Sequence, residues 1–86
     1  MTGFERARSS MVQTQLVPRG IADKRVLAAF RTVPREAFVP GELVGEAFDD
    51  GPLPLIEGQT ISQPYIVAVT AEALQLAGQE RVLEVG

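Results

Sequence analysis

The chain has 86 residues, enough for one small domain, and its hydrophobic content of 45% is typical of a globular rather than a disordered protein. It contains no cysteine and no histidine, which excludes a disulfide framework, thiolate chemistry, histidine-dependent hydrolytic triads and the usual zinc sites. The net charge of −3 is unevenly distributed, because residues 1–41 hold seven Arg or Lys and three acidic residues, whereas residues 42–86 hold one Arg and eight acidic residues.

The basic first half predicts two amphipathic helices. Apolar side chains recur at helical spacing over residues 4–16, and Pro18 ends this segment. Asp23 is a typical N-cap for a second helix over residues 23–33, which is expected to stop before Pro34 because a residue that precedes proline avoids the helical conformation. Basic residues spread over such helices, without interleaved aromatic side chains, favour solvated surfaces over a nucleic-acid site.

The middle of the chain predicts short turns separated by proline and glycine. A turn is expected over residues 34–38, where proline takes the first helical position, and Phe38 and Val39 are predicted core residues. The apolar residues between 43 and 48 fit a short helix. Residues 49–52 have the composition of a turn.

An edge segment, a polar loop and a third helix are predicted next. Residues 53–56 are apolar but contain a proline, which is typical of an extended segment at a sheet edge, and residues 59–63 form a loop. A third helix over residues 64–77 begins with proline in its first turn and takes Ser62 or Gln63 as its cap. Its predicted apolar stripe consists of Ile66, Val69, Ala73 and Leu76, widened by Val67 and Leu74.

The last residues predict a buried strand. Gly78 fits the position just after the third helix, and residues 81–85 follow as a short apolar strand. Val82 and Leu83 are adjacent, so both faces of the strand are expected to be covered, as in a parallel sheet. A buried strand that ends on a glycine, here Gly86, commonly opens a nucleotide-binding turn, but it can also precede an ordinary turn.

The loop before the third helix carries two hydroxyls. Thr60 and Ser62, together with the free N–H groups at the start of the helix, could face a ligand. An ordinary capped turn explains the same residues, and from spacing alone it is the favoured interpretation because such caps are common.

Three other features have a functional and a plain interpretation. Arg35 could bind an anionic group, although a surface ion pair is the simpler hypothesis. Asp49 and Asp50 could form part of a metal site, although turn residues are more common where no other ligands are near. Tyr65, the single tyrosine, could stack on a ligand, although packing beneath the loop is the default for a half-buried aromatic ring.

Several segments, in order from about Met11 onward, together resemble protein-L-isoaspartate O-methyltransferases. The run from Gln59 to Pro64 is highly specific to that family, and the final segment matches its first methyltransferase motif. The matching segments are Gln15-Leu, Arg19-Gly-Ile, Asp23 with Arg25-Val-Leu, Val33-Pro-Arg-Glu, Phe38-Val-Pro, Pro52-Leu-Pro-Leu, Gly58-Gln-Thr-Ile-Ser-Gln-Pro-Tyr and Arg81-Val-Leu-Glu-Val-Gly.

This resemblance implies an α/β fold, the Rossmann-like fold of S-adenosylmethionine-dependent methyltransferases. The chain would hold an N-terminal helical cap over residues 1–58 and the start of the methyltransferase domain over residues 59–86, with the substrate loop and the first parallel strand. Ser62 is implied as the active-site residue, and no metal is implied. The implied cofactor contacts are Gln59, Thr60, Ile61, Ser62, Glu84, Val85 and Gly86.

The implied activity is protein repair. Members of the family transfer a methyl group from S-adenosylmethionine to the free α-carboxyl of L-isoaspartyl residues in damaged proteins, and the ester then cyclises to a succinimide that reopens partly to aspartate. The attacking carboxylate is already ionised at neutral pH and the sulfonium is already an activated donor, so this chemistry needs neither histidine nor a strong base. Proteins and peptides that contain isoaspartate are the expected partners.

Two other functions stay open from the sequence. One is a small helical module that binds nucleic acid or protein, and the other is a non-catalytic relative that keeps the helical cap. The charges in residues 1–8 predict no signal peptide, and no apolar run is long enough to span a membrane, so a cytoplasmic protein is expected. The 86 residues by themselves are expected to be inactive, and the sequence predicts no oligomeric state.

Overall fold

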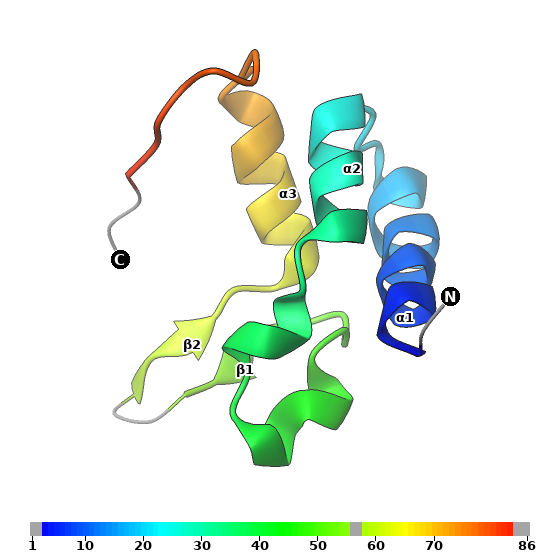
Figure 1. The fold of residues 1–86 in the computed structure, drawn as a ribbon, viewed down its shortest axis with the longest axis vertical. Coiled ribbons are helices and arrows are strands. Elements are labelled where there is room, and N and C mark those ends of the chain that lie inside the picture. Colours follow the sequence, from blue (N-terminus) through cyan, green and yellow to red (C-terminus); the bar gives the residue numbers. More distant parts are fainter. Residues whose placement is uncertain (1–2, 56–57, 84–86) are drawn as a thin grey trace.

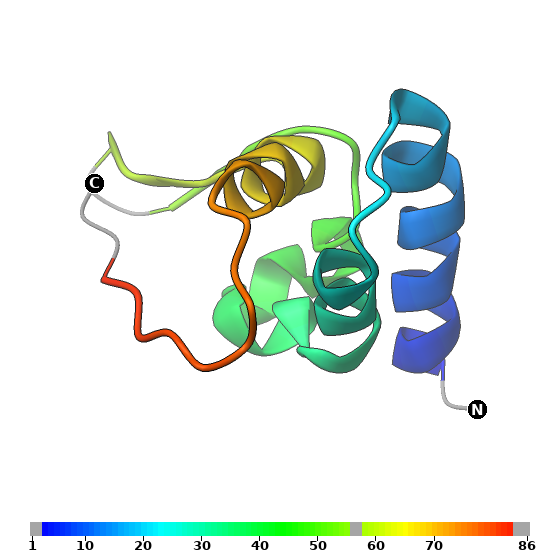
Figure 2. The same cartoon turned by 90° about the horizontal axis from the view of Figure 1, so that it is seen from above.

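The computed structural model describes residues 3–55 and 58–83 (Figure 1). The α-helices lie side by side, with α2 between α1 and α3 in both views (Figures 1 and 2), and the strands and the short helical turns over residues 35–46 lie at one end of them in Figure 1. In chain order the elements are α1 (Gly3–Met11), the wide π-helical turn η1 (Val12–Leu16), the 3-10 turn η2 (Val17–Arg19), α2 (Lys24–Thr32), the 3-10 turns η3 (Arg35–Phe38) and η4 (Gly41–Glu46), β1 (Leu53–Pro54), β2 (Thr60–Ile61) and α3 (Pro64–Ala73).

The first predicted helix is confirmed, although its second half is wider than an α-helix. α1 continues directly into η1, and the Thr14 hydroxyl donates to the carbonyl of Ser10 at 2.8 Å, a side-chain bond that competes with the backbone ladder at this point. The segment ends at Gly20, whose φ of 94° is a left-handed conformation that suits glycine. This run directs Val12 and Leu16, both 0% exposed, into the interior.

The second helix begins and ends as predicted. Asp23 is its N-cap, and Asp23 Oδ1 accepts the backbone N–H groups of Arg25 at 2.8 Å and Val26 at 3.2 Å. Glu72 from α3 accepts the N–H groups of Ala22 and Asp23, both at 2.8 Å, so the third helix fixes the start of the second. At the other end the backbone is already extended at the residue before the proline at position 34.

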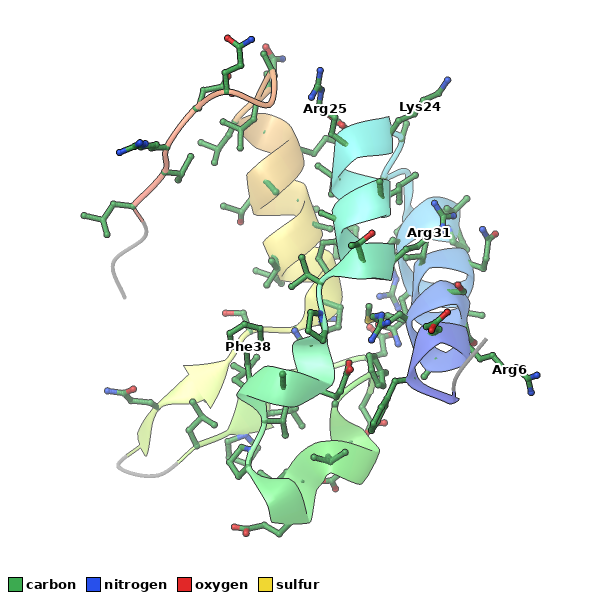
Figure 3. All side chains as sticks on the ribbon, in the orientation of Figure 1. Arg6, Lys24, Arg25, Arg31 and Phe38 are labelled. Carbon is green, nitrogen blue, oxygen red and sulfur yellow. The ribbon has the colours of Figure 1, made fainter. Side chains whose placement is uncertain are left out.

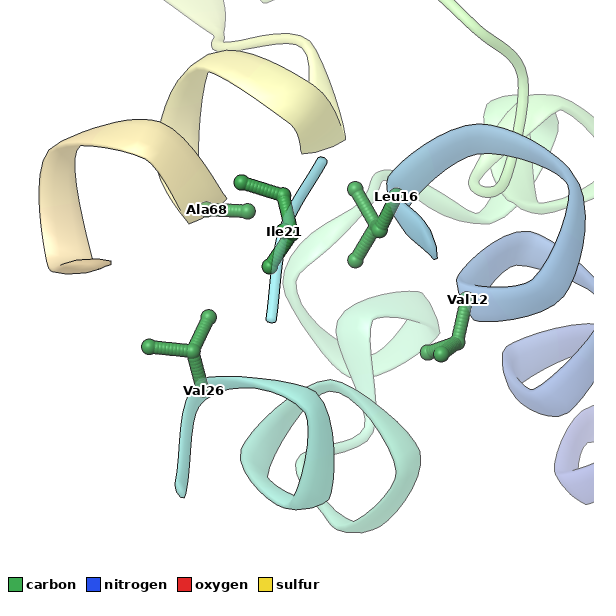
Figure 4. Close-up of a cluster of buried hydrophobic side chains, with 5 residues drawn as sticks. All are labelled: Val12, Leu16, Ile21, Val26 and Ala68. Atoms are coloured by element: carbon green, nitrogen blue, oxygen red, sulfur yellow. The ribbon is translucent and has the colours of Figure 1, made fainter. Parts of the chain in front are cut away.

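A small core forms where the three helices meet. Buried side chains from the first helical segment, from the connection after it, and from α2 and α3 converge there (Figure 4). Leu27, Phe30, Tyr65 and Ala71 pack against them while half-buried. The buried members are Val12, Leu16, Ile21, Val26 and Ala68.

The predicted apolar stripe of the third helix is wrong. α3 contacts the core through Ala68, which is 0% exposed, whereas Ile66 and Val69 are 50% and 38% exposed. The helix is apolar around most of its circumference, so the periodicity of its apolar residues does not select one face. The small alanine lets the helix approach its neighbours closely, and the larger side chains are left on the surface.

The end of the third helix also differs from the prediction. The helix stops at Ala73, and Gln75, with a φ of 51°, takes the left-handed position expected for Gly78. The carboxylate of Glu80 then accepts the N–H groups of Ala77 at 2.7 Å and Gly78 at 2.8 Å. These bonds, the first the largest, lower the pKa of Glu80 to about 2 and order the turn that follows the helix.

A second cluster lies beneath η3 and η4. Val39, Ala47 and Leu53 are buried, and Leu43, Phe48 and Ile61 pack against them; this confirms the core prediction for Val39. The same prediction for Phe38 is wrong, because its side chain is 69% exposed. The backbone leaves η3 in an extended conformation at Val39, so neighbouring side chains point to opposite sides and only one of the two can enter the cluster.

The two strands form a short antiparallel pair at the edge of this cluster. Leu53 pairs with Ile61 and Pro54 with Thr60, which confirms the edge segment and converts part of the predicted loop into a strand. The backbone N–H of Leu55 donates to the carbonyl of Gln59 at 2.6 Å. The chain can reverse here because Gly58 adopts a φ of 75°.

The predicted strand over residues 81–85 is wrong for the part that the structure describes. Residues 81–83 form no strand, and Val82 and Leu83 are 56% and 88% exposed. A parallel strand needs a neighbouring strand for its backbone hydrogen bonds, and none of the described residues supplies one. The remaining predicted residues of this strand, Glu84 and Val85, lie outside the described residues, as does Gly86.

Candidate active site

The residues from Gln59 to Ser62 connect the two-stranded sheet to the third helix. Ile61 contacts the second cluster, so alternation along the extended backbone places Thr60 and Ser62 on the opposite, solvent-exposed side. Gln63 occupies the N-cap of α3 but makes no side-chain bond to the helix, so the predicted side-chain cap is not formed there. Among the described residues no group bonds to the Ser62 hydroxyl, and the residue is exposed.

Arg35 holds the loop by its backbone. Its Nε donates to the carbonyl of Ala47 at 2.5 Å, and its Nη2 donates to the carbonyl of Ser62 at 3.0 Å. Arg35 therefore does not form the predicted surface ion pair. Its forked guanidinium instead bridges two backbone carbonyl groups. Burial lowers the pKa of the Arg35 guanidinium, which still carries its charge at neutral pH.

Asp50 fixes the loop from its other side. Its carboxylate accepts hydrogen bonds from both Nη atoms of Arg19, with Nη1 at 2.7 Å from Oδ1. It also accepts one from the side-chain amide of Gln63 at 2.8 Å. The hydrogen bonds from Arg19 and then Gln63 lower the pKa of Asp50 to about 2. The guanidinium carbon of Arg19 also lies 5.5 Å from the ring centroid of Tyr65, which packs half-buried against the helical core.

These contacts also decide between the earlier interpretations of two residues, Tyr65 and Asp50. Tyr65 is half-buried and packs against the helical core, which favours its plain interpretation as a packing residue. Asp50 is a turn residue that binds an arginine, and in the described part of the chain no group of three or more acidic side chains could hold a metal ion. Arg19 was missed as a site residue, and the contacts of Arg35 and Gln63 were not predicted, because partners 31, 27 and 13 residues away give no signal in local spacing.

The acid stability of the loop should depend on Asp50. The pKa of Asp50 falls from an ordinary value of 3.8 to about 2 in the folded protein. Its contribution to stability is therefore fully present above pH 3.8 and disappears as the pH falls through about 2. Replacing Asp50 with Asn should lower the free energy of unfolding by a constant amount at neutral pH, and the difference should close over this acid range.

Urea denaturation of the full-length protein at a series of pH values measures this difference. Asp49→Asn is the matched control, because it removes an adjacent exposed carboxylate that makes no bond to Arg19 or Gln63. A gap between wild type and the Asp50 variant that stays unchanged down to pH ~2 would contradict the assignment.

An apolar recess lies beside this loop. It has a volume of about 510 Å³ and is lined by α2, α3, Ile61 and Arg35. Phe38 extends from η3 into the region between the long helices and the sheet, whereas Lys24 and Arg25 project at the opposite end of α2 (Figure 3). A recess of this size with apolar walls is typical of a surface that a ligand or another part of the protein covers.

A comparison with protein-family models decides the classification. The model described as protein-L-isoaspartate(D-aspartate) O-methyltransferase matches residues 6–86. The chain belongs to this family. This confirms the resemblance read from the sequence and displaces the alternative of a small helical module that binds nucleic acid or protein.

Individual relatives agree with the family assignment. The chain is 68% identical to the protein-L-isoaspartate O-methyltransferase of Methylorubrum extorquens strain PA1 over 93% of its own length and 35% of the relative's. It is 65% identical to a protein-L-isoaspartate O-methyltransferase 2 of Shewanella sediminis over 96% of its length and 34% of the relative's. It is 55% identical over its full length to a protein-L-isoaspartate O-methyltransferase 1 of Syntrophobacter fumaroxidans, covering 40% of that protein. The chain thus spans little more than a third of the length of these relatives.

The structure describes only part of the predicted cofactor site. The loop half of the predicted cofactor site, Gln59–Ser62, is described and held in place, whereas the other half, Glu84–Gly86, lies outside the described residues. None of the helices that the described residues form combines the length and apolarity needed to cross a bilayer.

Proposed function

We propose that the chain is the N-terminal part of a protein-repair methyltransferase. The full protein would transfer a methyl group from S-adenosylmethionine to the free α-carboxyl of L-isoaspartyl residues in damaged proteins. The observation that carries this proposal is the family match across residues 6–86, which includes the loop with the exposed Ser62. Proteins that contain isoaspartate would be its partners, and the cytoplasm its location.

The described residues fit one half of an S-adenosylmethionine site. An exposed loop with free hydroxyls lies beside an apolar recess of about 510 Å³, and the recess reaches Ile61 on the same segment. Gln59, Thr60, Ile61 and Ser62 would hold one side of the cofactor, and Glu84, Val85 and Gly86 the other. When bound, the cofactor supplies an activated methyl group on a sulfonium.

The role of the chain's own residues would be to position the substrate. Ser62 would donate a hydrogen bond from its hydroxyl to the substrate carboxylate and orient one oxygen toward the methyl carbon without protonating the group. A carboxylate is ionised at neutral pH, so no histidine is needed as a base. Attack of an anion on a cation cancels charge, so exclusion of water from the completed site would favour the reaction.

The exposed apolar surface supports a larger Rossmann-like domain around this chain. Ile66, Val67 and Val69 on α3 and Val82 and Leu83 after it are all at least 38% exposed. We infer that in the full protein residues 81–85 enter a parallel sheet formed with the rest of the methyltransferase domain, which would cover these side chains. Residues 1–58 would then act as the helical cap, and residues 59–86 as the start of that domain.

Replacing Ser62 with Ala in the full-length protein tests the proposed role. We expect kcat for methylation of an isoaspartyl peptide to fall by about 10- to 100-fold, because the carboxylate loses the group that orients it. The affinity for S-adenosylmethionine should change much less. Steady-state kinetics measure the first quantity and calorimetric titration the second.

The control removes a hydroxyl elsewhere. Ser10→Ala changes an exposed residue of α1 and should leave both measurements at the wild-type level. A Ser62 variant with wild-type kcat would remove Ser62 from the mechanism. A wild-type protein that does not methylate isoaspartyl peptides would overturn the proposed function itself.

A further inference from the structure

We propose that Arg35 is the positioning residue that sets the orientation of Ser62 in the methyl-transfer reaction. The inference rests on the proposed function of the chain. Arg35 does not contact the Ser62 hydroxyl, so it is not a catalytic residue. It acts by fixing the backbone from which that hydroxyl projects.

The first argument is the geometry of the guanidinium. A single planar group donates Nε to the carbonyl of Ala47 and Nη2 to the carbonyl of Ser62, at 2.5 and 3.0 Å. The two bonds leave from different nitrogen atoms of a rigid fork, so they fix the distance and the angle between the two carbonyl groups. A lysine ammonium is a single point donor on a flexible stem and cannot hold the same two groups in one orientation.

The second argument is that the other end of the fork is anchored. Ala47 is 0% exposed and belongs to the buried cluster of Val39, Ala47 and Leu53. Ser62 itself lies in an exposed segment between β2 and α3. Arg35 therefore transmits the rigidity of a packed cluster to a loop residue that has little packing of its own.

The third argument is that Arg35 is held in place at its own position. Its neighbour Glu36 binds Arg8 of α1, with Nη1 at 2.9 and 3.1 Å from the two carboxylate oxygens. The Arg8 and Glu36 side chains are only 11% and 13% exposed, so this pair is well shielded from solvent. The Nε of Arg8 also donates to the carbonyl of Arg31 at 2.9 Å, which ties α1 to α2 just before η3. The base of the fork is thus fixed to two helices.

The environment of Arg35 strengthens these bonds. The guanidinium is partly buried and lines the apolar recess, and this burial lowers the pKa of the group. A hydrogen bond from a cation to a carbonyl group gains strength where water is excluded, which applies to the part-buried bond from Arg35 to Ala47. The bond to Ala47 is part-buried and the bond to Ser62 is exposed, so the fork is anchored at its Ala47 end.

A double-mutant cycle in the full-length protein tests the inference. Arg35→Lys keeps the charge but breaks the fork, and we expect it to lower kcat for isoaspartyl peptide methylation by about tenfold. The dissociation constant for S-adenosylmethionine should change by less than about threefold, since the effect passes through one hydroxyl. In the Ser62→Ala background the same Arg35→Lys change should have almost no further effect on kcat, because the group that it positions is gone.

A control variant distinguishes a specific role of Arg35 from a general effect of exchanging arginine for lysine. Arg31→Lys is the matched control, because it makes the same exchange at an exposed position on α2 and keeps the backbone carbonyl that Arg8 uses. Effects of Arg35→Lys and Ser62→Ala that multiply, or an Arg35 variant with wild-type kcat, would overturn the inference. Unaltered melting temperatures exclude general unfolding as the cause of the loss.

Hydrogen exchange gives a second measurement that does not depend on activity. Arg35→Lys should increase amide exchange in the segment 60–63 and leave α1 unchanged. If the wild-type protein methylates no isoaspartyl peptide, the proposed function fails, and this measurement alone decides whether Arg35 fixes the loop. Unchanged exchange in the segment 60–63 would then overturn the inference as well.

Discussion

By itself, the 86-residue chain is expected to transfer no methyl group and to bind S-adenosylmethionine weakly or not at all. Only the loop half of the proposed cofactor site, Gln59–Ser62, is held by the described contacts. Val82 and Leu83, which lead toward the other half, are 56% and 88% exposed and pair with no strand in the described part of the chain. A site that needs both halves is therefore incomplete.

The energetic reason is the amount of apolar surface that stays in water. Covering a side chain such as Leu83 or Val82 stabilises a protein by about 1.5–3 kcal/mol. A small domain has a total stability of about 5–15 kcal/mol, so several uncovered side chains are a large fraction of it. The chain covers only 35% of the length of its Methylorubrum relative.

Calorimetric titration of the isolated chain with S-adenosylmethionine, alongside the full-length protein, measures the difference. In a methylation assay on an isoaspartyl peptide, the isolated chain should likewise be far less active than the full-length protein. Micromolar binding by the isolated chain would show that Gln59–Ser62 and the residues around it form a more complete site than we propose.

Replacing Leu16 with Ala should cause a large loss of stability. Leu16 is 0% exposed at the centre of the core, where it meets side chains from α2 and α3. Truncation of a fully buried leucine removes apolar burial and leaves a cavity, which together cost about 2–5 kcal/mol. Because this core also supports α3, whose N-terminus follows the Ser62 loop, activity should fall at temperatures where the wild type is still folded.

Leu16→Met is the control for this prediction, since it keeps the side chain apolar and close to the original volume. It should cost less than about 1.5 kcal/mol. Urea denaturation of the full-length variants gives the free energies, and kcat for peptide methylation measured at low temperature separates loss of folding from loss of chemistry. Equal stabilities for the Ala and Met variants would mean that Leu16 is not a core residue in the full protein.

Local chemistry made much of the helical structure predictable. Asp23 starts the second helix because its own carboxylate accepts N–H groups two and three residues away, and Pro64 starts the third because its ring fixes φ near the helical value. Pro34 ends the second helix through its clash with the preceding residue. Each of these signals depends on a few neighbouring atoms, so the sequence alone contains them.

The family was also determined by the sequence. The run from Gln59 to Pro64 and the segments around it carry the resemblance, and the match over residues 6–86 confirms it. Such a pattern identifies a family without describing how its residues are held. The sequence therefore predicted Ser62 as a site residue but not the contacts that support its loop.

Only the tertiary structure decided those contacts and the distribution of side chains between core and surface. The third helix is apolar on most sides, so Ala68 faces the core and Ile66 does not because of where the neighbouring helices lie. Arg35 meets Ser62 across 27 residues and Arg19 meets Asp50 across 31, and both pairs form because packing of the helices and of the second cluster brings distant segments together. Local spacing carries no information about such pairs, since their separation in space depends on the path of the whole chain between them.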